Sequence, residues 1–529
     1  MGENEIFDVV VVGGGAAGLS GALALSRARR SVLVVDAGEP RNAPAGHVHN
    51  YLGREGTPPA ELLAIGRAEV ASYGGRVTAG RVASARAWDR DDTGFVVTLD
   101  DGRELLARRL LVTTGLVDEL PDVPGLRERW GRDVLHCPYC HGFEVRDQAL
   151  GVLASNGFAV HQALLFRQWS DDVTLFLDGG PAPSDDDAER LAARGIRVVA
   201  DAVERLVVED DRLVGLALAG GDVVARGAVV VSPRFTARSA VLESLGLHPV
   251  EVEMQGVVFG SSIPAEPTGA TTVPGVWVAG NVTDLRAQVL PAAAGGLNAA
   301  AMLNADLIEE DTRIAVEHRR MVLAMLEEPA WEERYRTSPA VWSGNPNPQL
   351  VAEATALPAG RALDIGSGEG ADSIWLAAHG WRVTALDFSR VALERAAGHA
   401  EAAGGEVAGR IEWCHADVRE WQADGASYDL VTSQFMQLPD GQMTDLVGRL
   451  ARAVAPGGTL LVVGHHPHDV ATGLRGHGAD LMFAAEDLAP ALDGDEWDVQ
   501  VVEARPREAA GPDGGLVTVH DAVLRARRR

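Results

Sequence analysis

Apolar residues gather along the chain in short runs, each of which stops abruptly at a glycine or an acid. The first run, 7–12, leads into a cluster of glycines and a segment of helical periodicity that extends to Arg27, and the second, 31–35, ends in Asp36. Short apolar runs bounded by turn residues are typical of buried strands in a parallel sheet. Their alternation with helices predicts an α/β fold from the beginning of the chain.

The same order of strand, turn and helix returns later in the sequence. Apolar runs at 110–114 and 276–279 end in turns that contain Gly115 and Asn281, and a run at 361–365 precedes a second glycine-rich turn. A chain of 529 residues is too long for one hydrophobic core. We therefore expect roughly three or four domain-sized units.

Composition narrows the classes of partner. The formal net charge is −28 at pH 7, and binding to phosphates needs clustered Lys and Arg, so we expect no nucleic-acid partner. No apolar run approaches the roughly 18 residues that would span a bilayer, so we expect no membrane partner either. The chain begins with acidic residues, unlike a signal peptide, and has only three cysteines. These features favour the reducing cytoplasm.

Two of the three cysteines form a Cys-x-x-Cys pair, Cys137 and Cys140, flanked by His136 and His141. Two thiols one turn apart can cycle between dithiol and disulfide, and a neighbouring imidazole can stabilise a thiolate and move its proton. A tetrahedral zinc site would need a second pair of ligands elsewhere, and a structural disulfide is unusual in a reducing compartment. We therefore expect redox catalysis, with all four residues in the site.

The first glycine cluster has the spacing Gly-x-Gly-x-x-Gly at Gly13, Gly15 and Gly18, and the next strand ends in Asp36. This arrangement places a pyrophosphate on a helix amino terminus and an acid near a ribose. Because strand, helix and acid agree with the glycine spacing, the motif predicts a dinucleotide site rather than an ordinary turn.

In this order the segments resemble the low-molecular-weight thioredoxin reductase family of FAD-dependent disulfide oxidoreductases, over about residues 5–310. The resemblance implies a homodimer in which Cys140 lies against the flavin and Cys137 exchanges with substrate. The family has an acid after the second cysteine, where this chain has His141, so an imidazole is expected to transfer the proton. The residues implied to bind FAD are Gly13, Gly15, Gly18, Asp36, Gly115, Asn281 and Gln288.

The resemblance also implies a divided architecture of two dinucleotide-binding domains. We expect an FAD domain in two parts, 1–118 and 245–310, with an inserted NAD(P)-binding-like domain at 119–244 that carries the cysteine pair. A helical linker at 311–330 then leads to a further domain at 331–529.

The inserted domain departs from the family at its nicotinamide loop. Ala154 and Asn156 stand where two glycines would let the pyrophosphate approach the backbone, and Asp178 would repel a 2′-phosphate. Use of NAD(P)H is therefore doubtful. The pattern Cys-x-x-Cys-His-Gly and the altered loop resemble the dithiol oxidases of the gliotoxin and holomycin type, which pass electrons through FAD to oxygen. An NAD(P)H-dependent thioredoxin reductase and a redox sensor without rapid turnover remain alternatives.

The second glycine-rich turn opens a different nucleotide site. The acids that follow its strands, in order, make this series resemble the class I S-adenosylmethionine-dependent methyltransferases, a Rossmann-like fold, over about 331–529. The resemblance implies that the loop approaches the methionine part, that Asp387 binds the ribose hydroxyls and that Asp417 binds the adenine amine. The residues implied are Asp364, Gly366, Gly368, Gly370, Asp387 and Asp417.

The methyl acceptor is expected to be a small molecule, because no acidic–aromatic nucleic-acid motif follows the fourth strand. The domain resembles small-molecule methyltransferases of the tellurite-resistance and thiopurine type, which act on soft nucleophiles, so a thiol is favoured. His465, His466 and His468 follow a strand and could be a general base, a substrate contact or a polar loop. The aromatic segment 331–347 is expected to form a lid. The sequence thus predicts a bifunctional enzyme with a small thiol or disulfide substrate.

Overall fold

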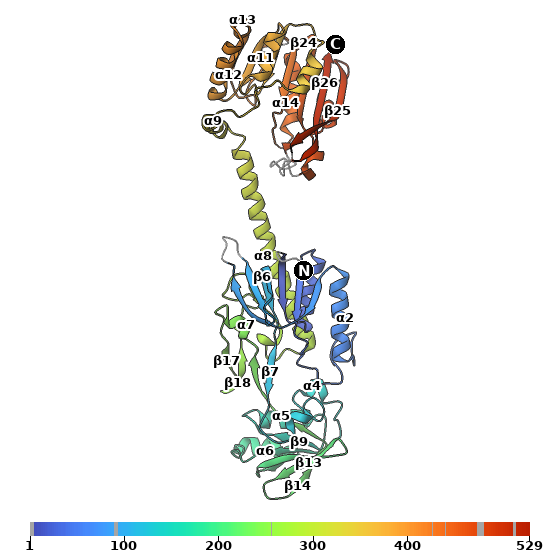
Figure 1. The fold of residues 1–529 in the computed structure, drawn as a ribbon. Coiled ribbons are helices and arrows are strands. Elements are labelled where there is room, and N and C mark those ends of the chain that lie inside the picture. The colour runs from blue at the N-terminus through green and yellow to red at the C-terminus, as the bar shows by residue number, and fades with distance from the viewer. Residues whose placement is uncertain are drawn as a thin grey trace. The chain divides into compact units, whose positions relative to one another are not determined.

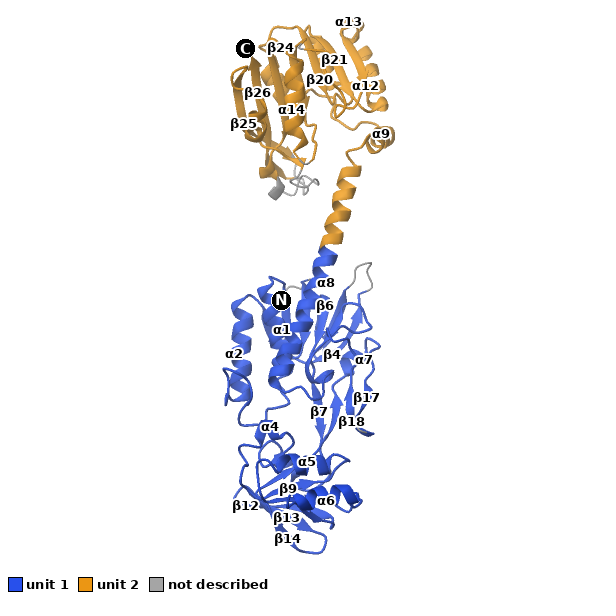
Figure 2. Cartoon of the chain, turned by 180° about the vertical axis from the view of Figure 1, so that it is seen from behind, with its two compact units in different colours: residues 1–311 blue, residues 312–529 orange. Residues whose placement is uncertain are grey.

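The computed structural model describes residues 5–88, 94–254, 256–425, 427–439, 441–472, 481–510 and 515–529. The chain divides into two compact units, residues 1–311 and 312–529, which are coloured separately in Figure 2. Each unit has its own sheets and its own hydrophobic core.

The first unit is built on a sheet with the strand order β3-β2-β1-β6-β5-β4, in which β19 also pairs with β6 (Figure 1). The apolar runs of β1, β2 and β6 pair in parallel and are buried on both faces, as strands covered by helices require. The elements are β1 (Ile6–Val12), α1 (Ala16–Arg27), β2 (Val32–Asp36), α2 (Pro59–Ser72), β3 (Arg76–Ala79), β4 (Val82–Ala87), β5 (Phe95–Leu99), β6 (Glu104–Val112), α7 (Ala240–Glu243), β19 (Val276–Val278) and a 3-10 turn, η1 (Gly280–Val282).

A four-stranded sheet, β17-β18-β16-β7, joins this part to the inserted domain. The chain leaves the FAD-binding part along β7 and returns along β16, which pairs with β7 in antiparallel. The two chain segments that connect the FAD-binding part to the inserted domain therefore lie side by side. The chain between them forms the inserted domain, which has its own sheets. The strands are β7 (Leu116–Glu119), β16 (Arg234–Ala237), β17 (Val250–Met254) and β18 (Val257–Ser262).

The inserted domain has a parallel sheet, β11-β10-β9-β15-β8, and an antiparallel sheet, β12-β13-β14. The Cys-x-x-Cys pair lies just after β8, on a short helix. The elements are α3 (Leu126–Arg129), β8 (Val134–Leu135), α4 (Pro138–His141), β9 (Leu150–Leu153), α5 (Ala159–Phe166), β10 (Val173–Phe176), α6 (Asp185–Ala193), β11 (Arg197–Val199), β12 (Val203–Glu209), β13 (Arg212–Leu218), β14 (Val223–Ala225) and β15 (Ala228–Val230).

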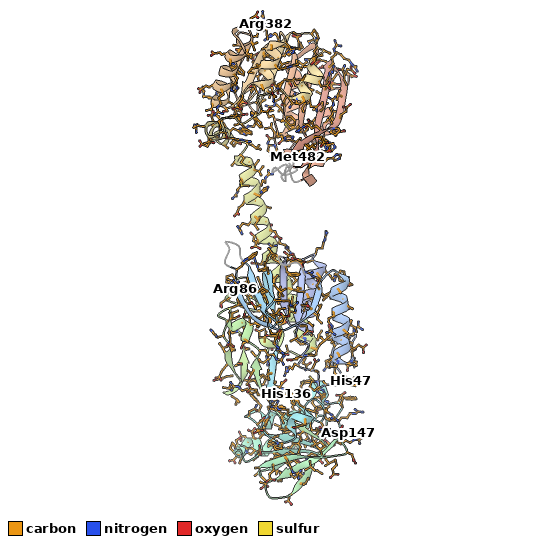
Figure 3. All side chains as sticks on the ribbon, viewed as in Figure 1. His47, Arg86, His136, Asp147, Arg382 and Met482 are labelled. Carbon is orange, nitrogen blue, oxygen red and sulfur yellow. The ribbon has the colours of Figure 1, made fainter. Side chains whose placement is uncertain are left out.

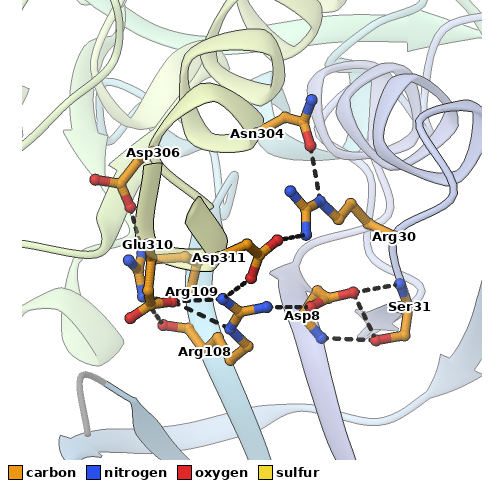
Figure 4. Close-up of polar contacts among 9 residues, drawn as sticks. All are labelled: Asp8, Arg30, Ser31, Arg108, Arg109, Asn304, Asp306, Glu310 and Asp311. Carbon is orange, nitrogen blue, oxygen red and sulfur yellow. Dashed lines mark hydrogen bonds and ion pairs between the residues drawn. The ribbon is translucent and has the colours of Figure 1, made fainter. Parts of the chain in front are cut away.

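One long helix, α8 (Val289–Ala324), closes the first unit and continues past its end. Gly296 of α8 lies so close to α1 that a Cβ there would stand 1.9 Å from the Ala17 carbonyl oxygen. The next turns of α8 are fixed by ion pairs to three arginines (Figure 4). The pairs are Arg30 with Asp311, Arg108 with Asp8, Glu310 and Asp311, and Arg109 with Asp306 and Glu310.

The second unit has one seven-stranded sheet, β22-β21-β20-β23-β24-β26-β25. The first five strands pair in parallel and the last two in antiparallel. The elements are α9 (Glu328–Thr337), α10 (Pro348–Ala354), β20 (Arg361–Ile365), α11 (Ala371–Ala378), β21 (Arg382–Asp387), α12 (Arg390–Ala403), α13 (Gly405–Ala408), β22 (Ile411–His415), β23 (Tyr428–Gln434), α14 (Gln442–Ala453), β24 (Val454–His465), η2 (Pro467–Thr472), α15 (Ala485–Leu488), η4 (Ala489–Ala491), β25 (Trp497–Ala510) and β26 (Leu516–Arg528).

The α/β architecture agrees with the sequence prediction in both units. The linker expected to be helical at 311–330 is helical through residue 324, as the end of α8. Residues 331–335 of the expected lid lie on helix α9. Within the described ranges, no helix is both long enough and apolar enough to cross a membrane.

Candidate active sites

The first glycine loop is shaped by close backbone contacts. Gly13 has φ +108°, and a Cβ on Gly18 would stand 1.9 Å from the Gly13 carbonyl oxygen. Gly15, in contrast, has no atom within 4 Å of where its Cβ would be, and α1 begins directly after it. The free space above Gly15 at a helix amino terminus therefore fits the pyrophosphate of the predicted FAD.

A cavity of about 1190 Å³ extends from this loop to the cysteine pair. All predicted FAD residues except Gly18 line it, and so do the four predicted catalytic residues. A single chamber thus holds both the glycine loop and the dithiol. The predicted residues in its lining are Gly13, Gly15, Asp36, Gly115, Asn281, Gln288, His136, Cys137, Cys140 and His141.

The two cysteines differ in their surroundings. Cys137 is the N-cap of α4, and a hydrogen bond from the Cys140 thiol, with weaker ones from backbone amides and Gln288, lowers the pKa of Cys137 to about 7. The Gln288 Nε2 atom lies 3.5 Å from the Cys137 sulfur. The hydrogen bond to Cys137, together with burial, raises the pKa of Cys140. Cys137 is therefore the thiolate of the pair near neutral pH.

The flanking histidines are placed for different tasks. The Nδ1–H of His136 donates to the Val231 carbonyl at 3.1 Å, and burial lowers the pKa of His136, so this imidazole is neutral. Burial also lowers the pKa of His141, whose buried Nε2 atom has no hydrogen-bond partner in the described part of the chain. His141 is therefore available as a base for a proton from the dithiol.

The loop before α2 contacts α4 through groups that the sequence analysis did not single out. His47 and His136 both line the cavity (Figure 3). The Nδ1 atom of His49 lies 2.6 Å from Glu55 and its Nε2 atom lies 3.5 Å from Glu144. Asn50 donates to the Tyr139 carbonyl at 2.6 Å. The only sequence signal for this contact was the pattern His47-x-His49, which is weak on its own.

Arg41 is a second residue that the sequence analysis missed. Its guanidinium makes two hydrogen bonds of 2.7 and 2.9 Å to Asp118 and donates to the Asn281 Oδ1 atom at 3.3 Å. The Asn281 amide nitrogen donates to the carbonyls of Asp284 and Ala287. The side chain of Asn281 is thus held within the protein, while the residue still lines the cavity.

The loop after β9 bonds to itself and to the neighbouring strand. Ser155 donates to the Ser232 carbonyl at 2.8 Å, and Asn156 accepts from the Phe158 amide at 3.0 Å. Phe158 is buried and packs edge-on against Phe259, with 5.9 Å between the ring centroids. Side chains therefore occupy the place where a nicotinamide loop would offer bare glycine backbone.

The acid after β10, Asp178, also forms a hydrogen bond within the protein. Asp178 has a left-handed φ of +52°, and its Oδ1 atom accepts from the Val203 amide at 2.7 Å. Its carboxylate adds negative charge at the end of the strand, where a 2′-phosphate would have to bind. The residues present therefore fit NADPH poorly.

In the second unit the glycine loop is tied to a buried acid. Asp387 ends β21, and its two oxygens accept from the amides of Gly368 and Ser389 at 2.8 Å each. Asp364 ends β20 and accepts from the Ser373 hydroxyl at 2.6 Å, and burial raises the pKa of Asp364 to about 7. These acids lie at the carboxyl ends of neighbouring parallel strands, where α/β folds bind ligands, and so fit S-adenosylmethionine.

Gly366, Gly368 and Gly370 all have positive φ, between +53° and +86°. A Cβ on Gly368 would stand 3.1 Å from both Tyr335 and Trp342. The loop therefore needs glycine for its backbone conformation and for the close approach of the aromatic segment that precedes the domain.

That aromatic segment covers the loop as a small cluster. Tyr335 is 3% exposed and accepts from the Trp342 Nε1–H at 3.0 Å, and Trp342 stacks on Trp331 at 5.9 Å. Glu369 accepts from the amides of Val341 and Trp342 at 3.1 Å. The segment expected to form a lid thus packs directly on the glycine loop.

Asp417 lies in an ion-pair network. Arg419 donates to the Asp417 Oδ2 atom at 2.7 and 2.9 Å and to its Oδ1 atom at 3.1 Å, and it also contacts Glu327 between α8 and α9. The Arg419 guanidinium and the backbone hydrogen bond lower the pKa of Asp417 against the effect of burial. Asp417 is therefore ionised and already has a cationic partner at the place predicted for adenine.

Comparison with known proteins assigns each unit. The sequence profile described as pyridine nucleotide-disulphide oxidoreductase matches residues 7–296, more than half of the chain. The chain belongs to the pyridine nucleotide-disulphide oxidoreductase family. A second profile, described as a methyltransferase domain, matches residues 362–458. This member of the oxidoreductase family therefore carries an added methyltransferase.

Three similar proteins match the oxidoreductase part of the chain. Thioredoxin reductase sirT of Leptosphaeria maculans is 30% identical over 58% of this chain and 96% of its own length. The solved structure of HlmI is 49% identical with a TM-score of 0.56, and the match covers 60% of this chain and 97% of that chain. An oxidoreductase from Agrobacterium tumefaciens is 36% identical with a TM-score of 0.53, over 57% and 99%. These proteins thus have no counterpart to about two fifths of this chain.

Together these findings give the general activities. The first unit is an FAD-dependent thiol–disulfide oxidoreductase of the thioredoxin reductase type, and the second is an S-adenosylmethionine-dependent methyltransferase. FAD and S-adenosylmethionine are accordingly the cofactors of the two units.

Proposed function

We propose that the first unit oxidises a small dithiol to a disulfide, with oxygen as the final electron acceptor. The observation that carries this proposal is the nicotinamide loop, in which Ser155 and Asn156 bond locally and Phe158 is packed inward. The FAD loop and the dithiol, in contrast, share one open cavity. A flavin that cannot receive a hydride from NADPH must be reduced through the cysteines.

The chemistry of Cys137 suits exchange with a small dithiol. A substrate thiolate attacks the Cys137 sulfur of the Cys137–Cys140 disulfide, and Cys140 leaves as the thiolate. The second substrate thiolate then attacks the substrate sulfur of this mixed disulfide and displaces Cys137, which forms the substrate disulfide. A thiol with a pKa of about 7 leaves readily as the thiolate. His141 takes up a proton from the substrate dithiol as it ionises. When bound, FAD accepts the electron pair of the reduced cysteines and passes it to oxygen.

Exposed apolar side chains near the cysteine pair favour a small apolar substrate. Tyr139, which lines the cavity, is 58% exposed, and Phe143, three residues after the second cysteine, is 63% exposed. Large exposed apolar side chains beside a cavity mark a binding site more often than an ordinary surface. We therefore propose an uncharged small-molecule dithiol rather than an acidic protein as the substrate.

Anaerobic titration of the flavin tests this proposal. We expect a small dithiol such as dithiothreitol to bleach the flavin with one equivalent per site, and re-aeration to restore the spectrum with formation of hydrogen peroxide. NADPH and NADH should bleach it at least about a hundredfold more slowly, because the pyrophosphate loop is blocked. Rapid bleaching by NADPH would identify a reductase, and slow reduction by every donor would identify a sensor.

For the second unit we propose S-methylation of a small thiol. A thiol is the chemical group on which both units could act. One unit would set its redox state, and the other would methylate it. Transfer of labelled methyl from S-adenosylmethionine to a panel of thiol, hydroxyl and amine acceptors tests this idea. Transfer to oxygen or nitrogen but to no thiol would refute it.

A further inference from the structure

The second unit contains a cluster of histidine side chains that are not among the predicted S-adenosylmethionine-binding residues. We propose that His520, positioned by Asp469, is the general base that removes the proton from the acceptor thiol during methyl transfer. This inference rests on the proposed S-methylation and adds the residue that would activate the sulfur.

His520 and Asp469 form a dyad of defined orientation. Asp469 is fully buried, and its carboxylate accepts from the His520 backbone amide at 2.9 and 3.0 Å and from the His520 Nδ1–H at 3.1 Å. Because Nδ1 donates to the carboxylate, the lone pair of the neutral ring is on Nε2. The side chain of His520 is 30% exposed, so Nε2 can meet a ligand while Asp469 stabilises the imidazolium that forms.

Two further histidines complete the cluster. The ring of His468 lies 5.7 Å from that of His520 and 4.4 Å from that of His466. The Nδ1 atom of His466 accepts from the His468 amide at 3.2 Å, and burial lowers the pKa of His466, so that ring stays neutral with its proton on Nε2. Within the described ranges, Asp469 and, beside His466, Glu486 are charged groups that act on these rings. His520 is thus the ring with a directly bonded carboxylate.

The dyad lies at the same edge of the sheet as the cofactor loop. In register, Ile365 pairs with Ser433, Gln434 pairs with Val463, and His465 pairs with Asp521. The distance across the sheet from β20 to β26 is therefore three strand spacings, about 14 Å at roughly 4.8 Å each. A bound cofactor that points its methyl group along this edge leaves room for a small acceptor before His520.

The segment after β23 connects the two places. Phe435 has a left-handed φ of +56°, which is costly for an aromatic residue, and its ring lies 4.6 Å from that of His465. The sulfur of the next residue, Met436, would be 3.5 Å from a Cβ on Gly366. Phe435 and Met436 therefore lie between the glycine loop and His465, which precedes His466 of the cluster, and would line one side of the acceptor site.

In the proposed methyl transfer, the thiol proton moves to the Nε2 atom of His520. The thiolate sulfur then forms a bond to the methyl carbon, and the sulfonium C–S bond breaks to leave S-adenosylhomocysteine. The imidazolium then returns its proton to solvent. An ordinary thiol has a pKa near 8.5 and is largely protonated at pH 7, so a neighbouring imidazole that accepts its proton raises the thiolate fraction where it is needed.

The test compares His520→Gln with the wild type on two acceptors in the full-length protein. With an alkyl thiol at pH 7, we expect the variant to lose about 30-fold in rate, the factor by which a thiol of pKa near 8.5 is short of thiolate at that pH, and to regain it tenfold per pH unit toward the thiol pKa. With an aromatic thiol of pKa below 5, which is already ionised, the variant should keep nearly the wild-type rate. His468→Gln, on the exposed side of the cluster, is the matched control and should change neither rate by more than about threefold.

Calorimetric titration with S-adenosylmethionine and the melting temperature check that His520→Gln folds and binds the cofactor within twofold of the wild type. An unchanged pH profile for the alkyl thiol would overturn the assignment of His520, and so would an equal loss on both thiols. If the wild type methylates neither thiol, the proposed S-methylation fails first and the base assignment falls with it. The two failures are therefore distinguished by the wild-type measurement alone.

Discussion

At the scale of single residues, Cys137 owes its reactivity to groups from two separate parts of the chain. The Cys140 thiol and the amides of α4 are local, but Gln288 comes from the segment that precedes α8, 151 residues away. The returning half of the FAD-binding part thus contributes directly to the dithiol. A cysteine near neutral pKa is both a good nucleophile and a good leaving group, which suits repeated exchange.

Replacing Gln288 with Met should remove one hydrogen-bond donor from the thiolate while keeping the shape of the side chain. We expect the pKa of Cys137 to rise above about 7 and the alkylation of the reduced protein by iodoacetamide at pH 7 to slow by about two- to fivefold. The pH dependence of labelling at Cys137, followed by mass spectrometry, measures this shift. Cys414, whose pKa is raised by burial, is the internal control. An unchanged midpoint would show that Gln288 has no influence on the thiolate.

At the scale of secondary-structure elements, sequence patterns predicted the two glycine loops better than they predicted the anchoring of α8. Both loops depend on neighbours within a few residues, such as Gly13 against Gly18. The helical character of α8, including the linker, was predicted as well, but its anchoring by arginines far away in the chain, including Arg30 and Arg108, was not. The contact of Arg41 with Asn281 likewise joins residues 240 positions apart and has no local signal.

The ion pairs of Arg108 should be worth measurably more than an ordinary surface pair. Its guanidinium lies 2.5–2.9 Å from Asp8, Glu310 and Asp311. Arg108→Ala leaves these acids close together with less compensation, so we expect a loss of about 1–3 kcal/mol in the free energy of unfolding of the first unit. Part of this loss should return in high salt, because repulsion between the acids is screened.

Arg313→Ala is the matched control on the same helix, because Arg313 is exposed and, within the part of the chain that the structure describes, its ion pair is with Glu317 four residues on. We expect it to cost less than about 0.5 kcal/mol. Thermal unfolding followed by flavin fluorescence compares the two variants. Equal melting temperatures would mean that the Arg108 network does not stabilise the first unit.

At the scale of the whole molecule, each unit has a separate core and a separate cofactor loop. The relatives of the first unit are matched over nearly their full lengths by less than two thirds of this chain. We therefore expect a truncated protein of residues 1–324, which keeps all of α8, to fold, bind FAD and react with dithiols at a rate within about twofold of the full-length protein.

A second truncation after Leu303 serves as the comparison. It keeps the buried residues of α8 up to Leu303 but removes buried Leu307 together with Asp306, Glu310 and Asp311, the partners of the three arginines. We expect lower yield and earlier flavin release on heating. If residues 1–324 fail to bind FAD while the full-length protein does so, the second unit is required for the first.

The buried acids behind the second glycine loop have a thermodynamic consequence. Burial raises the pKa of Asp364 to about 7 and that of Asp372 to about 6, so near neutral pH these carboxyls retain part of a proton. S-adenosylmethionine has a net positive charge, which favours their ionised forms and so expels protons on binding. Its affinity should therefore increase from pH 6 to pH 8. The binding enthalpy should also differ between phosphate and Tris in proportion to the heats of ionisation of these buffers, and equal enthalpies would mean that no proton is released.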